Sequence, residues 1–489
     1  MIPLNQRALT ALPAGKNLFS YDRSQVRAGI VHLSVGNFHR AHQAWYVDQL
    51  LNHSGNTHWG ICGVGLLDDE NECLKRDVFA AQDNLYTLTR YKNDGSETHQ
   101  IIGSIVSYLF APDDRRAVLE RMAAPEIRIV SMTITEGGYN QEPGTGRYRL
   151  DHPATQAELA DPDHPHSAFG FIVAALKLRR ARGIAPFTVL SCDNLRHNGR
   201  ITHQAVVAHA EALDPELAAW IEENVTFPNA MVDRITPAVL KEDALPIDEA
   251  SGIQDALPVI SEDFAQWVIE DRFVNGRPYL EEVGVQFVED VGPYELMKVR
   301  MLNAAHSVLA YPGQLAGFND VRDAITNPSI RELVDIFLRR DVAPTLPAPK
   351  GMDLDIYRAT IIKRFSNPHI IDRLPRITGD GWSKLATFLA PTFNHVVEED
   401  GDVTRMVFVL ACFTRYLRGV TDDGQEFEPF EPQMPDAERE ASRHDALSLS
   451  VFQHFNLHQR PPIMSEIRRW EERIERHGTL KALERLLDG

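Results

Sequence analysis

The sequence predicts an α/β fold in its first part and a mainly α-helical fold in its last part. Up to about residue 192, apolar runs of strand length alternate with segments whose apolar residues recur at helical spacing, a pattern typical of a mostly parallel sheet. From Tyr294 onward almost only helical spacing is found. A chain of 489 residues is long enough for two or three domains. We therefore expect a sheet domain at residues 1–288 and a mainly helical domain at 289–489.

The first part reads as repeated strand–helix units. Strands are expected at 29–35, 59–64, 127–135 and 187–192, and helices at 38–51, 113–124 and 169–181. Residues 242–263 are rich in proline and aspartate and predict a loop, and residues 267–288 are expected to extend the sheet. Ligands of such sheets bind beyond the carboxyl ends of the strands. The residues that follow the expected strands are glycines, acids and amides, which suits a ligand site.

The second part is expected to contain helices at 293–311, 331–340, 354–364, 405–417 and 464–487, with Pro312 ending the first of them. On this first helix Lys298, Asn303 and His306 share one face, within an arc of about 140°. A lysine can take a proton, an amide can hydrogen-bond an oxygen, and a histidine can do either. The pattern indicates chemistry at a carbon that bears a hydroxyl group. The structural alternative is a surface lysine, a capped asparagine and a core histidine.

Composition excludes several classes of function. The chain is 43% hydrophobic and 24% charged, as in ordinary globular proteins. Its 50 basic and 69 acidic residues give a net charge of −19, which argues against binding to nucleic acid or an anionic membrane. The four cysteines form no CxxC pair, so we expect neither disulfides nor structural zinc. The amino-terminal segment lacks the apolar core of a signal peptide, and no membrane span is found, which predicts a cytoplasmic protein.

The turn after the first expected strand resembles a dinucleotide-binding fingerprint with fewer glycines. The full motif is G-x-G-x-x-G between a strand and a helix, whereas this turn reads Ser34-Val35-Gly36-Asn37-Phe38. The chemistry requires a tight turn whose backbone N–H groups approach a pyrophosphate at a helix amino terminus. Val35, Gly36, Asn37 and Phe38 are therefore candidate cofactor-binding residues. An ordinary strand-to-helix turn is the alternative.

Acidic residues follow the second expected strand. A carboxylate at this place can accept hydrogen bonds from a ribose diol and repels a 2′-phosphate, which favours NAD over NADP. Asp68 and Asp69 are the candidates, with Glu70 beside them, and a solvated acidic turn is the alternative. Their distance from Gly36 exceeds the usual spacing of about 20 residues, so the residue that faces the ribose stays open. Together these features predict a Rossmann-type domain.

Two further polar segments accompany the expected strand ends. Asn194 follows the strand at 187–192 and is expected at the ligand edge of the sheet, although an asparagine is also common in an ordinary turn. His39 and His42 are three residues apart, but no other ligands complete a metal shell nearby, so we expect them to fix the turn. No metal site is predicted.

These residues carry a resemblance to a known family. The chain is similar to the polyol-specific long-chain dehydrogenases and reductases, and within them to the mannitol dehydrogenases, over nearly its whole length. The matching segments are FHRAHQAWY (38–46), TITEGGY (133–139), FTVLSCDN (187–194), FPNAMVDRITP (227–237), QWVIEDRFVNGRP (266–278), KVRMLNAAH (298–306) and KRFSNP (363–368).

The resemblance implies a metal-independent, NAD-linked oxidation of a sugar alcohol to a ketose, with D-mannitol and D-fructose as the first expectation, by a monomeric enzyme. It implies that Lys298 is the general base and that Asn194 and Asn303 hold the substrate oxygen. His306 and Asp233 would contact the substrate and tune the base. Further site residues that it implies are Arg376 and Lys384 at the polyol and Glu136 at the cofactor.

The chain departs from the family pattern at three places. Ser34 stands where relatives usually have glycine, Ala304-Ala305 replaces Gly-Ser beside His306, and Pro312 is expected to shorten the catalytic helix compared with relatives that continue through it. Gly137 stands where the hexuronate reductases of the family carry lysine, which favours a neutral polyol. Other possibilities are a D-arabinitol 4-dehydrogenase, a hexuronate oxidoreductase, a zinc-dependent polyol dehydrogenase, and an NAD-binding regulator without catalysis. Retention of the whole set of catalytic residues disfavours the regulator.

Overall fold

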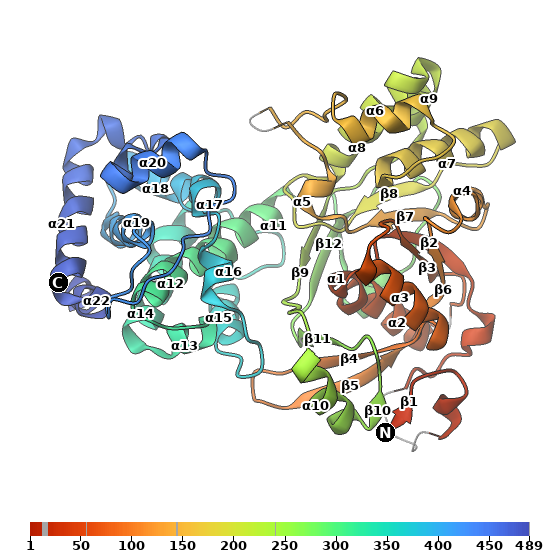
Figure 1. Cartoon of the computed structure of the whole chain (residues 1–489), viewed down its shortest axis with the longest axis horizontal. Helices are drawn as coiled ribbons and strands as arrows, with labels where there is room; N and C mark the ends of the chain where they lie inside the picture. Colours follow the sequence, from red (N-terminus) through yellow and green to blue (C-terminus); the bar gives the residue numbers. More distant parts are fainter. Residues whose placement is uncertain (12–17, 55, 143–144, 240, 489) are drawn as a thin grey trace. The chain divides into compact units, whose positions relative to one another are not determined.

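The chain divides into two compact units, which are described separately below. The computed structural model describes residues 1–11, 18–54, 56–142, 145–239 and 241–488. Unit 1 comprises residues 1–92 and 96–292, and unit 2 comprises residues 93–95 and 293–489. Unit 1 contains parallel sheet and helices, and unit 2 is built from helices (Figure 1). The predicted fold class is therefore confirmed.

Unit 1 is organised around a five-stranded parallel sheet with the order β6-β3-β2-β7-β8. The strands are β2 (Ala28–Leu33), β3 (Gly60–Gly65), β6 (Ile105–Phe110), β7 (Ile129–Met132) and β8 (Thr188–Ser191). All neighbouring pairs are parallel. The chain leaves the central strand β2 first to one side and later to the other. The change of direction between β2 and β7 is the place where such sheets bind ligands.

Both faces of this sheet are covered, which explains why its strands are almost wholly apolar. Val31 and Leu33 face a core shared with α4 (Arg115–Ala123), α7 (Ala168–Arg182), α8 (Asn198–Leu213) and α9 (Pro215–Asn224). Ile30 faces the opposite core, which includes α2 (Gln43–Ser54) and α3 (Glu70–Ala81). The four predicted strands and the helices predicted at 113–124 and 169–181 agree with the structure, apart from their ends, whereas β6 and α3 were not predicted.

The helix predicted at 38–51 is two helices, α1 (Asn37–Ala41) and α2, separated at His42. The backbone of His42 has φ −117° and ψ −88°, which is outside the helical range. The imidazole Nε2 of His42 lies 3.0 Å from the carbonyl oxygen of Gln266. A contact with a residue more than 200 positions away thus accompanies the break, and local spacing does not reveal it.

Two predictions for residues 242–288 are wrong. The expected loop at 242–263 contains α10 (Lys241–Ser251) and β11 (Val259–Glu262), and Pro246, which suggested a break, lies inside the helix. Residues 267–288 do not extend the main sheet but contribute β12 (Gln266–Glu270) and β13 (Gln286–Val288) to a separate sheet with β9 (Ala230–Asp233). The other small sheets contain β4 (Tyr86–Tyr91) and β5 (Glu97–Ile102) with β11, and β1 (Ile2–Pro3) with β10 (Ile253–Gln254).

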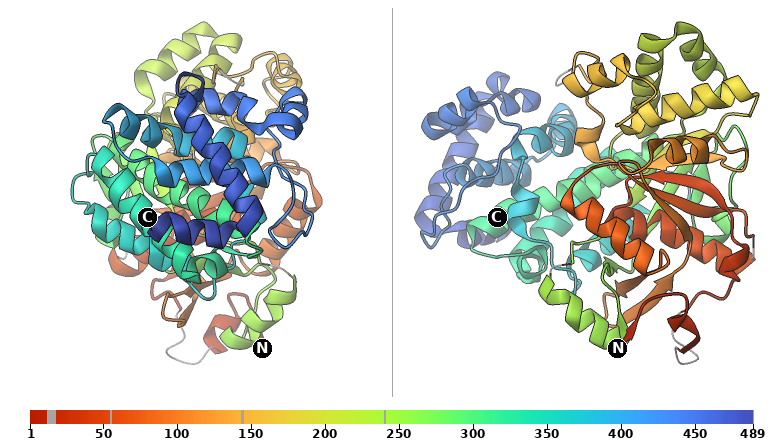
Figure 2. Two further views of the ribbon diagram at one scale, coloured as in Figure 1. Left: turned by 90° about the vertical axis from the view of Figure 1, so that its left-hand side faces the viewer. Right: turned by 45° about the vertical axis from the view of Figure 1, so that its right-hand side comes forward.

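Unit 2 is a helical unit around the central helix α12 (Ala304–Leu315), eleven of whose twelve residues are buried. The helices around it are α13 (Val321–Thr326), α14 (Pro328–Ile336), α15 (Leu354–Phe365), α16 (Leu374–Thr378), α17 (Gly381–Phe388), α18 (Ala390–Glu398), α19 (Thr404–Tyr416), α20 (Asp436–Asp445), α21 (Pro461–His477) and α22 (Thr479–Asp488). The predicted helix at 464–487 is α21 and α22, which meet at an angle at Gly478, as the darkest blue helices of Figure 2 show. Gly478 has φ +80°, a conformation that glycine adopts readily.

The helix predicted at 293–311 is also more complex than expected. It begins with α11 (Gly292–Met297), continues as a π-helical segment (Lys298–Asn303) and ends with α12. Pro312 was predicted to end the helix, but it lies inside the last turns of α12, which continues to Leu315. Among the described residues, none of the helices combines the length and apolarity needed to cross a lipid bilayer.

Candidate active site and cofactor site

The turn between β2 and α1 has the geometry of a close-approach site. Ser34 has φ +69°, and its N–H donates to the carbonyl of Val64 at 2.8 Å. A Cβ atom on Gly36 would meet nothing within 4 Å, so the space beside this glycine is open. The first N–H groups of α1, at Asn37 and Phe38, have no partner within a helix. Such a cradle fits the pyrophosphate of a dinucleotide. Val35 is fully buried in the core, so only its backbone faces this turn.

The three acidic residues after β3 differ in their surroundings. Asp69 is the N-cap of α3, and its carboxylate accepts the N–H of Glu72 at 2.9 Å. Asp68 lies just before this cap, is exposed, and has its Oδ1 3.9 Å from the Sγ of Cys73. Glu70 is exposed at the first turn of the helix. Asp69 thus has a structural role in addition to the predicted cofactor role.

Asp193, the neighbour of the predicted residue Asn194, was not itself predicted and organises the loop after β7. Its buried carboxylate accepts the N–H groups of Ile134 and Thr135 at 3.0 and 2.9 Å and the hydroxyl of Tyr139 at 2.8 Å. Burial raises the pKa of Asp193. Asp193 joins the ends of β7 and β8 and positions α5 (Thr135–Gly138).

The predicted residues Glu136 and Asn194 flank this loop. Glu136 lies in α5 and Asn194 follows β8, and both are exposed at the carboxyl edge of the sheet, where they were expected. The sequence signal for Asp193 is an acid placed directly after an apolar strand, because a carboxylate buried there needs hydrogen-bond donors.

Beneath the turn lies a cluster of buried polar side chains. The two ring nitrogens of His32, in β2, lie 2.8 Å from the hydroxyl of Ser131 and 3.0 Å from that of Thr133. The ring of His39 stacks on His32 at 3.4 Å between centroids. Burial lowers the pKa of His32 to about 3 and that of His39 well below its usual value. His39 therefore packs as a neutral ring under the turn, in agreement with the role expected for it.

Metal-ligating side chains do not gather in the described ranges: no group of three or more histidine, cysteine, aspartate or glutamate residues there is arranged to hold a metal ion. All four cysteines are free thiols.

Asp233 ends β9 in the three-stranded sheet of unit 1 and is 5% exposed. The next residue, Arg234, donates from Nη1 to the carbonyl of Ala41 at 2.6 Å and from Nε to that of Glu262 at 3.1 Å. These bonds place the end of β9 beside the end of α1. Within unit 1 the structure therefore brings the strand that carries Asp233 close to the helix that follows the predicted cofactor turn.

In unit 2, Lys298 and Asn303 are the first and last residues of the π-helical segment, and His306 follows in α12. In an α-helix, a step of five residues turns through about 500°, so the side chains of Lys298 and Asn303 would point about 140° apart. Hydrogen bonds from i to i+5 widen the helical turn, so a residue and the fifth residue after it lie closer to the same side than in an α-helix, and π-helical turns are frequent at functional sites. The observed segment therefore aligns Lys298 with Asn303 more closely than the predicted α-helix would.

The surroundings of these three side chains differ. Lys298 is 7% exposed, and Asn303 and His306 are half-buried. The imidazole of His306 lies against the ring of Phe365, in α15, at 4.3 Å between centroids. The three side chains thus lie along one side of a buried helix, with Lys298 buried and Asn303 and His306 partly exposed.

Arg376 and Lys384 lie on α16 and α17 of unit 2. Arg376 forms a two-pronged ion pair with the buried carboxylate of Asp372, with its Nη2 2.6 and 2.8 Å from the two oxygens, while its own side chain is 69% exposed. The Nζ of Lys384 donates to the carbonyl of Gly379 at 2.5 Å. Both cations therefore also make contacts within unit 2 that stabilise the α16–α17 region.

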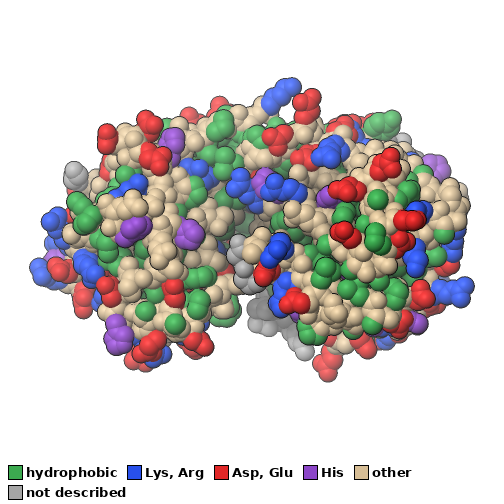
Figure 3. Space-filling view, turned by 90° about the horizontal axis from the view of Figure 1, so that it is seen from above, with side chains coloured by type: hydrophobic (Ala, Val, Ile, Leu, Met, Phe, Trp, Pro, Cys, Tyr) green, Lys and Arg blue, Asp and Glu red, His purple; other side chains and the backbone are tan. Residues whose placement is uncertain are grey.

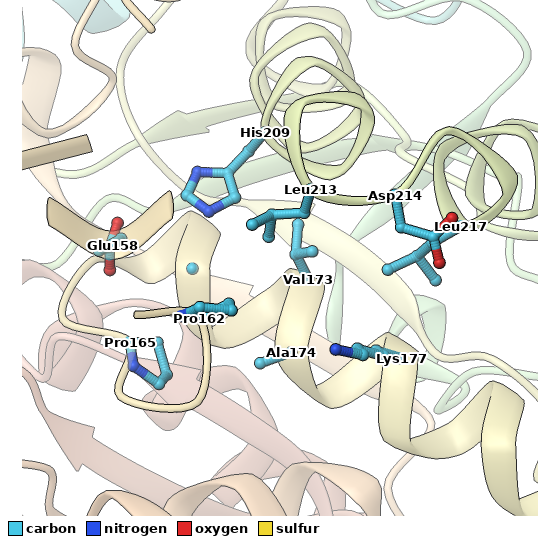
Figure 4. A pocket seen from close by; sticks show the side chains of 11 residues that line it. Glu158, Pro162, Pro165, Val173, Ala174, Lys177, His209, Leu213, Asp214 and Leu217 are labelled. Atoms are coloured by element: carbon cyan, nitrogen blue, oxygen red, sulfur yellow. The ribbon is translucent and has the colours of Figure 1, made fainter. Parts of the chain in front are cut away.

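A cavity of about 80 Å³ lies elsewhere in unit 1, among α7, α8, α9 and α6 (Pro153–Ala160). Figure 4 shows His209 and Glu158 at one end of it and Lys177 and Asp214 at the other. None of the predicted site residues lines it. On the face drawn in Figure 3, acidic and basic side chains are interspersed on each unit, as on ordinary water-exposed surfaces.

Comparison with known proteins identifies the family. The model of the mannitol dehydrogenase Rossmann domain matches residues 28–282, and that of the mannitol dehydrogenase C-terminal domain matches residues 290–474. A polyol:NADP oxidoreductase of Gluconobacter oxydans (strain 621H) is 46% identical over 453 residues, 92% of this chain and 93% of the relative. A mannitol 2-dehydrogenase of Aspergillus clavatus is 42% identical over 502 residues, 100% of this chain and 99% of the relative.

Two solved structures are similar over nearly the whole chain. D-sorbitol dehydrogenase in substrate-free form has a TM-score of 0.94 at 43% identity and covers 98% of this chain and 100% of its own. Pseudomonas fluorescens mannitol 2-dehydrogenase, in a ternary complex with NAD and D-mannitol, has a TM-score of 0.86 at 40% identity and covers 100% of both chains. Because both family models match and the relatives span almost the full length, the chain belongs to the mannitol dehydrogenase family and is an oxidoreductase.

Proposed function

We propose that the protein catalyses the NAD-dependent oxidation of a sugar alcohol to a ketose, and the reverse reaction, with D-mannitol and D-fructose as its substrate pair. The observation that carries this proposal is that the π-helical segment brings Lys298 and Asn303 toward one side of the helix, with His306 following in the first turn of α12. Membership of the mannitol dehydrogenase family supports polyol oxidation in general. The identity of the polyol is part of the proposal, because the relatives are named for different polyols, mannitol and sorbitol.

The chain's residues have the following proposed roles. Lys298, as a neutral amine, removes the hydroxyl proton of the alcohol, and the amide of Asn303 donates to the oxygen as it becomes negative. His306 binds a neighbouring substrate group and tunes the base. A nicotinamide cofactor bound beside the alcohol would supply the acceptor for the hydride of the carbinol carbon. Asn194 and Asp233 of unit 1 keep the substrate roles that the resemblance gives them.

The proposed cofactor site lies at the carboxyl edge of the parallel sheet. The open space beside Gly36 and the amides of Asn37 and Phe38 suit a pyrophosphate. The carboxylates of Asp68 and Asp69 after β3 favour an unphosphorylated ribose and hence NAD. The relatives differ here, since one structure holds NAD and one relative is named for NADP. Glu136, which is exposed at the same edge, is proposed to contact the cofactor.

A neutral polyol is favoured over a hexuronate for two reasons. Gly137 stands where the hexuronate reductases of the family carry a lysine, so that cation is absent here. A Cβ on Gly137 would meet nothing within 4 Å, so the place is open. The charge of Arg376 is already balanced by Asp372, which leaves it suited to hydroxyl groups. We propose that Arg376 and Lys384 bind polyol hydroxyls.

The substrate test measures NADH consumption at neutral pH with fructose, xylulose, fructuronate and tagaturonate. NAD and NADP reduction is then measured with mannitol, sorbitol and arabinitol. We expect turnover of fructose and mannitol with NAD(H), unchanged by a strong chelator. Turnover of the uronates alone would overturn the polyol assignment, and loss of activity on chelation would favour a zinc-dependent enzyme. No turnover of any pair would favour a regulator without catalysis.

The role of Lys298 is tested by Lys298→Ala. Turnover should fall by several orders of magnitude while NADH affinity, measured by fluorescence, is retained, because the proposed base is not part of the cofactor site. In the unmodified enzyme, polyol oxidation should accelerate toward alkaline pH, since only the neutral amine accepts a proton. Lys350→Ala removes an exposed lysine of the same unit and should leave turnover unchanged. Normal turnover of Lys298→Ala would end the assignment.

We further propose that the enzyme is a monomer with domains at 1–288 and 289–489. Light scattering coupled to gel filtration should give a mass near 55.1 kDa. A mass twice as large would contradict the monomer.

A further inference from the structure

The turn between α16 and α17 in unit 2 has an unusual backbone. Asp380 has φ +61°, a left-handed conformation that non-glycine residues rarely adopt. A Cβ on Gly379 would come within 2.8 Å of the ring of Phe430, and one on Gly381 would collide with the hydroxyl of Tyr311. This backbone therefore needs contacts that hold it in place. It also joins the two residues proposed to bind the polyol, Arg376 and Lys384.

One side of the turn is held by Glu431, whose side chain is almost fully buried at 2% exposed. Its Oε1 accepts the N–H of Gly381 at 3.1 Å, and its Oε2 accepts that of Trp382 at 2.9 Å. The carbonyl oxygen of Glu431 accepts a hydrogen bond from Nη2 of Arg439 at 2.8 Å. Glu431 is therefore fixed from α20 and binds the first two amides of α17, where a negative charge is favourable.

The other side of the turn is held by Lys384 itself. Its Nζ donates to the carbonyl of Gly379 at 2.5 Å and to that of Ile377, at the end of α16, at 3.4 Å. The turn thus lies between a carboxylate that binds its amides and an ammonium that binds its carbonyls. Movement of the α17 amino terminus would move Lys384, which lies one turn further along the same helix.

We propose that Glu431 is a positioning residue for polyol binding: by holding the first amides of α17 it orients Lys384 and, through the turn, Arg376. This inference rests on the proposed function, because it takes these two cations to bind the polyol. Glu431 does not touch the substrate in this account, and its effect should be confined to polyol affinity.

The protonation state of Glu431 provides a readout that a merely structural role would not change. Burial raises the pKa of Glu431 to about 7, and Asp380 acts in the same direction, whereas the two amides and Lys384 oppose the shift. Other titratable or charged groups that face it are Tyr311, Tyr416 and Arg439. Protonation removes the negative charge of the carboxylate and leaves a hydroxyl oxygen, which is a weaker acceptor for an N–H than a carboxylate oxygen. Below about pH 7, the hydrogen bond to one α17 amide is therefore weakened, and polyol binding should weaken with it.

The test compares the unmodified enzyme with Glu431→Gln and with Glu428→Gln, an exposed control on the same segment. Glutamine retains one acceptor oxygen but presents an NH₂ group to the second amide. We expect the KM for the polyol to rise about tenfold at pH 8, as the loss of one buried hydrogen bond implies. In Glu431→Gln the KM for NAD should change less than about twofold and kcat should change little. In the control variant Glu428→Gln the KM for the polyol should also change less than about twofold.

The pH profile completes the test. In the unmodified enzyme the polyol KM should rise as the pH falls from 8 to 6, and in Glu431→Gln it should be flat. A flat profile in the unmodified enzyme would overturn the proposal even if the variant does not fold. An unchanged polyol KM in a folded variant, or an equal rise for polyol and NAD, would also overturn it. Failure of the proposed function is distinguished from these results, because the unmodified enzyme would then turn over no polyol.

Discussion

The backbone of Ser34 adopts a conformation that the Cβ atom of a serine makes unfavourable. Its φ of +69° lies in the left-handed region, which costs a residue with a Cβ about 1–2 kcal/mol. Ser34→Gly should raise the free energy of unfolding by about 0.5–1 kcal/mol, because the relief of strain exceeds the added flexibility of the unfolded chain. Urea unfolding measures the change. Ser34→Ala retains the Cβ and should bring no gain. A loss of stability in the glycine variant would mean that the serine hydroxyl stabilises the turn by more than the strain.

Asp68 and Asp69 can be separated by serine substitutions. Serine caps a helix about as well as aspartate, so Asp69→Ser removes the charge but keeps the hydrogen bond to the N–H of Glu72. Each substitution should shift the ratio of kcat/KM for NAD and NADP toward NADP, and the larger shift identifies the carboxylate nearer the ribose. Asp69→Ala should in addition lower stability by about 1 kcal/mol. An unchanged ratio in both serine variants would contradict the proposed role of these acids.

At the scale of elements, the π-helical segment is anchored by Arg300 on its buried side. The guanidinium donates from Nε to the hydroxyl of Thr392 at 2.6 Å and from Nη2 to that of Thr345 at 2.8 Å. Burial lowers the pKa of Arg300 to about 10, so it stays charged at neutral pH. A buried cation held by hydroxyl groups depends strongly on each acceptor.

Thr392→Val should therefore disturb this segment. Valine has nearly the same shape but no acceptor, so the variant should lose about 1–3 kcal/mol of unfolding free energy. Because Arg300 lies between Lys298 and Asn303, kcat should fall as well. Thermal unfolding and steady-state kinetics provide the two measurements. Thr360→Val, whose hydroxyl bonds only to the carbonyl of Ile356 in its own helix, is the control. Unchanged stability in Thr392→Val would mean that water replaces the lost acceptor.

For the whole molecule, each unit contains a buried carboxyl group with a raised pKa. Burial raises the pKa of Asp48 in unit 1 to about 6 and that of Glu431 in unit 2 to about 7. In the unfolded chain both carboxyl groups have their usual pKa values of about 4. Between about pH 4 and 7 the folded protein therefore binds protons at these two groups more tightly than the unfolded chain does. The resulting stabilisation is complete below about pH 4 and is lost as the pH rises through 6 to 7.

Asp48→Asn tests this dependence in unit 1. Four donors surround the carboxylate, from Tyr21, Gly103, Gln100 and Asn52; an amide accepts fewer of them, so the variant should be less stable at every pH. Because the native proton-binding site is removed, the loss should be about 1–2 kcal/mol larger at pH 5 than at pH 8. Unfolding at the two pH values measures it, with exposed Asp163→Asn as control. An equal loss at both would contradict the raised pKa.

Local patterns in the sequence were sufficient for most of the alternating strands and helices of the main sheet region and for the helical character of unit 2, but not for β6 or for residues 242–288. They also placed Gly36, Asp68 and Asn194 beyond strand ends, because strand length, apolar runs and helical spacing are properties of neighbouring residues. The shared face of Lys298, Asn303 and His306 followed in the same way. Local patterns thus determined the fold class and these candidates, whereas Asp233, Glu136, Arg376 and Lys384 became candidates through the family resemblance.

Only the tertiary structure decided what depends on distant contacts. The break at His42 accompanies a bond to Gln266, and the π-helical segment is held by Thr345 and Thr392, more than 40 residues away. The loop role of Asp193 and the clamp by Glu431 likewise depend on donors that other elements supply. Buried polar groups must find partners, and folding, not sequence spacing, determines which partners are within reach.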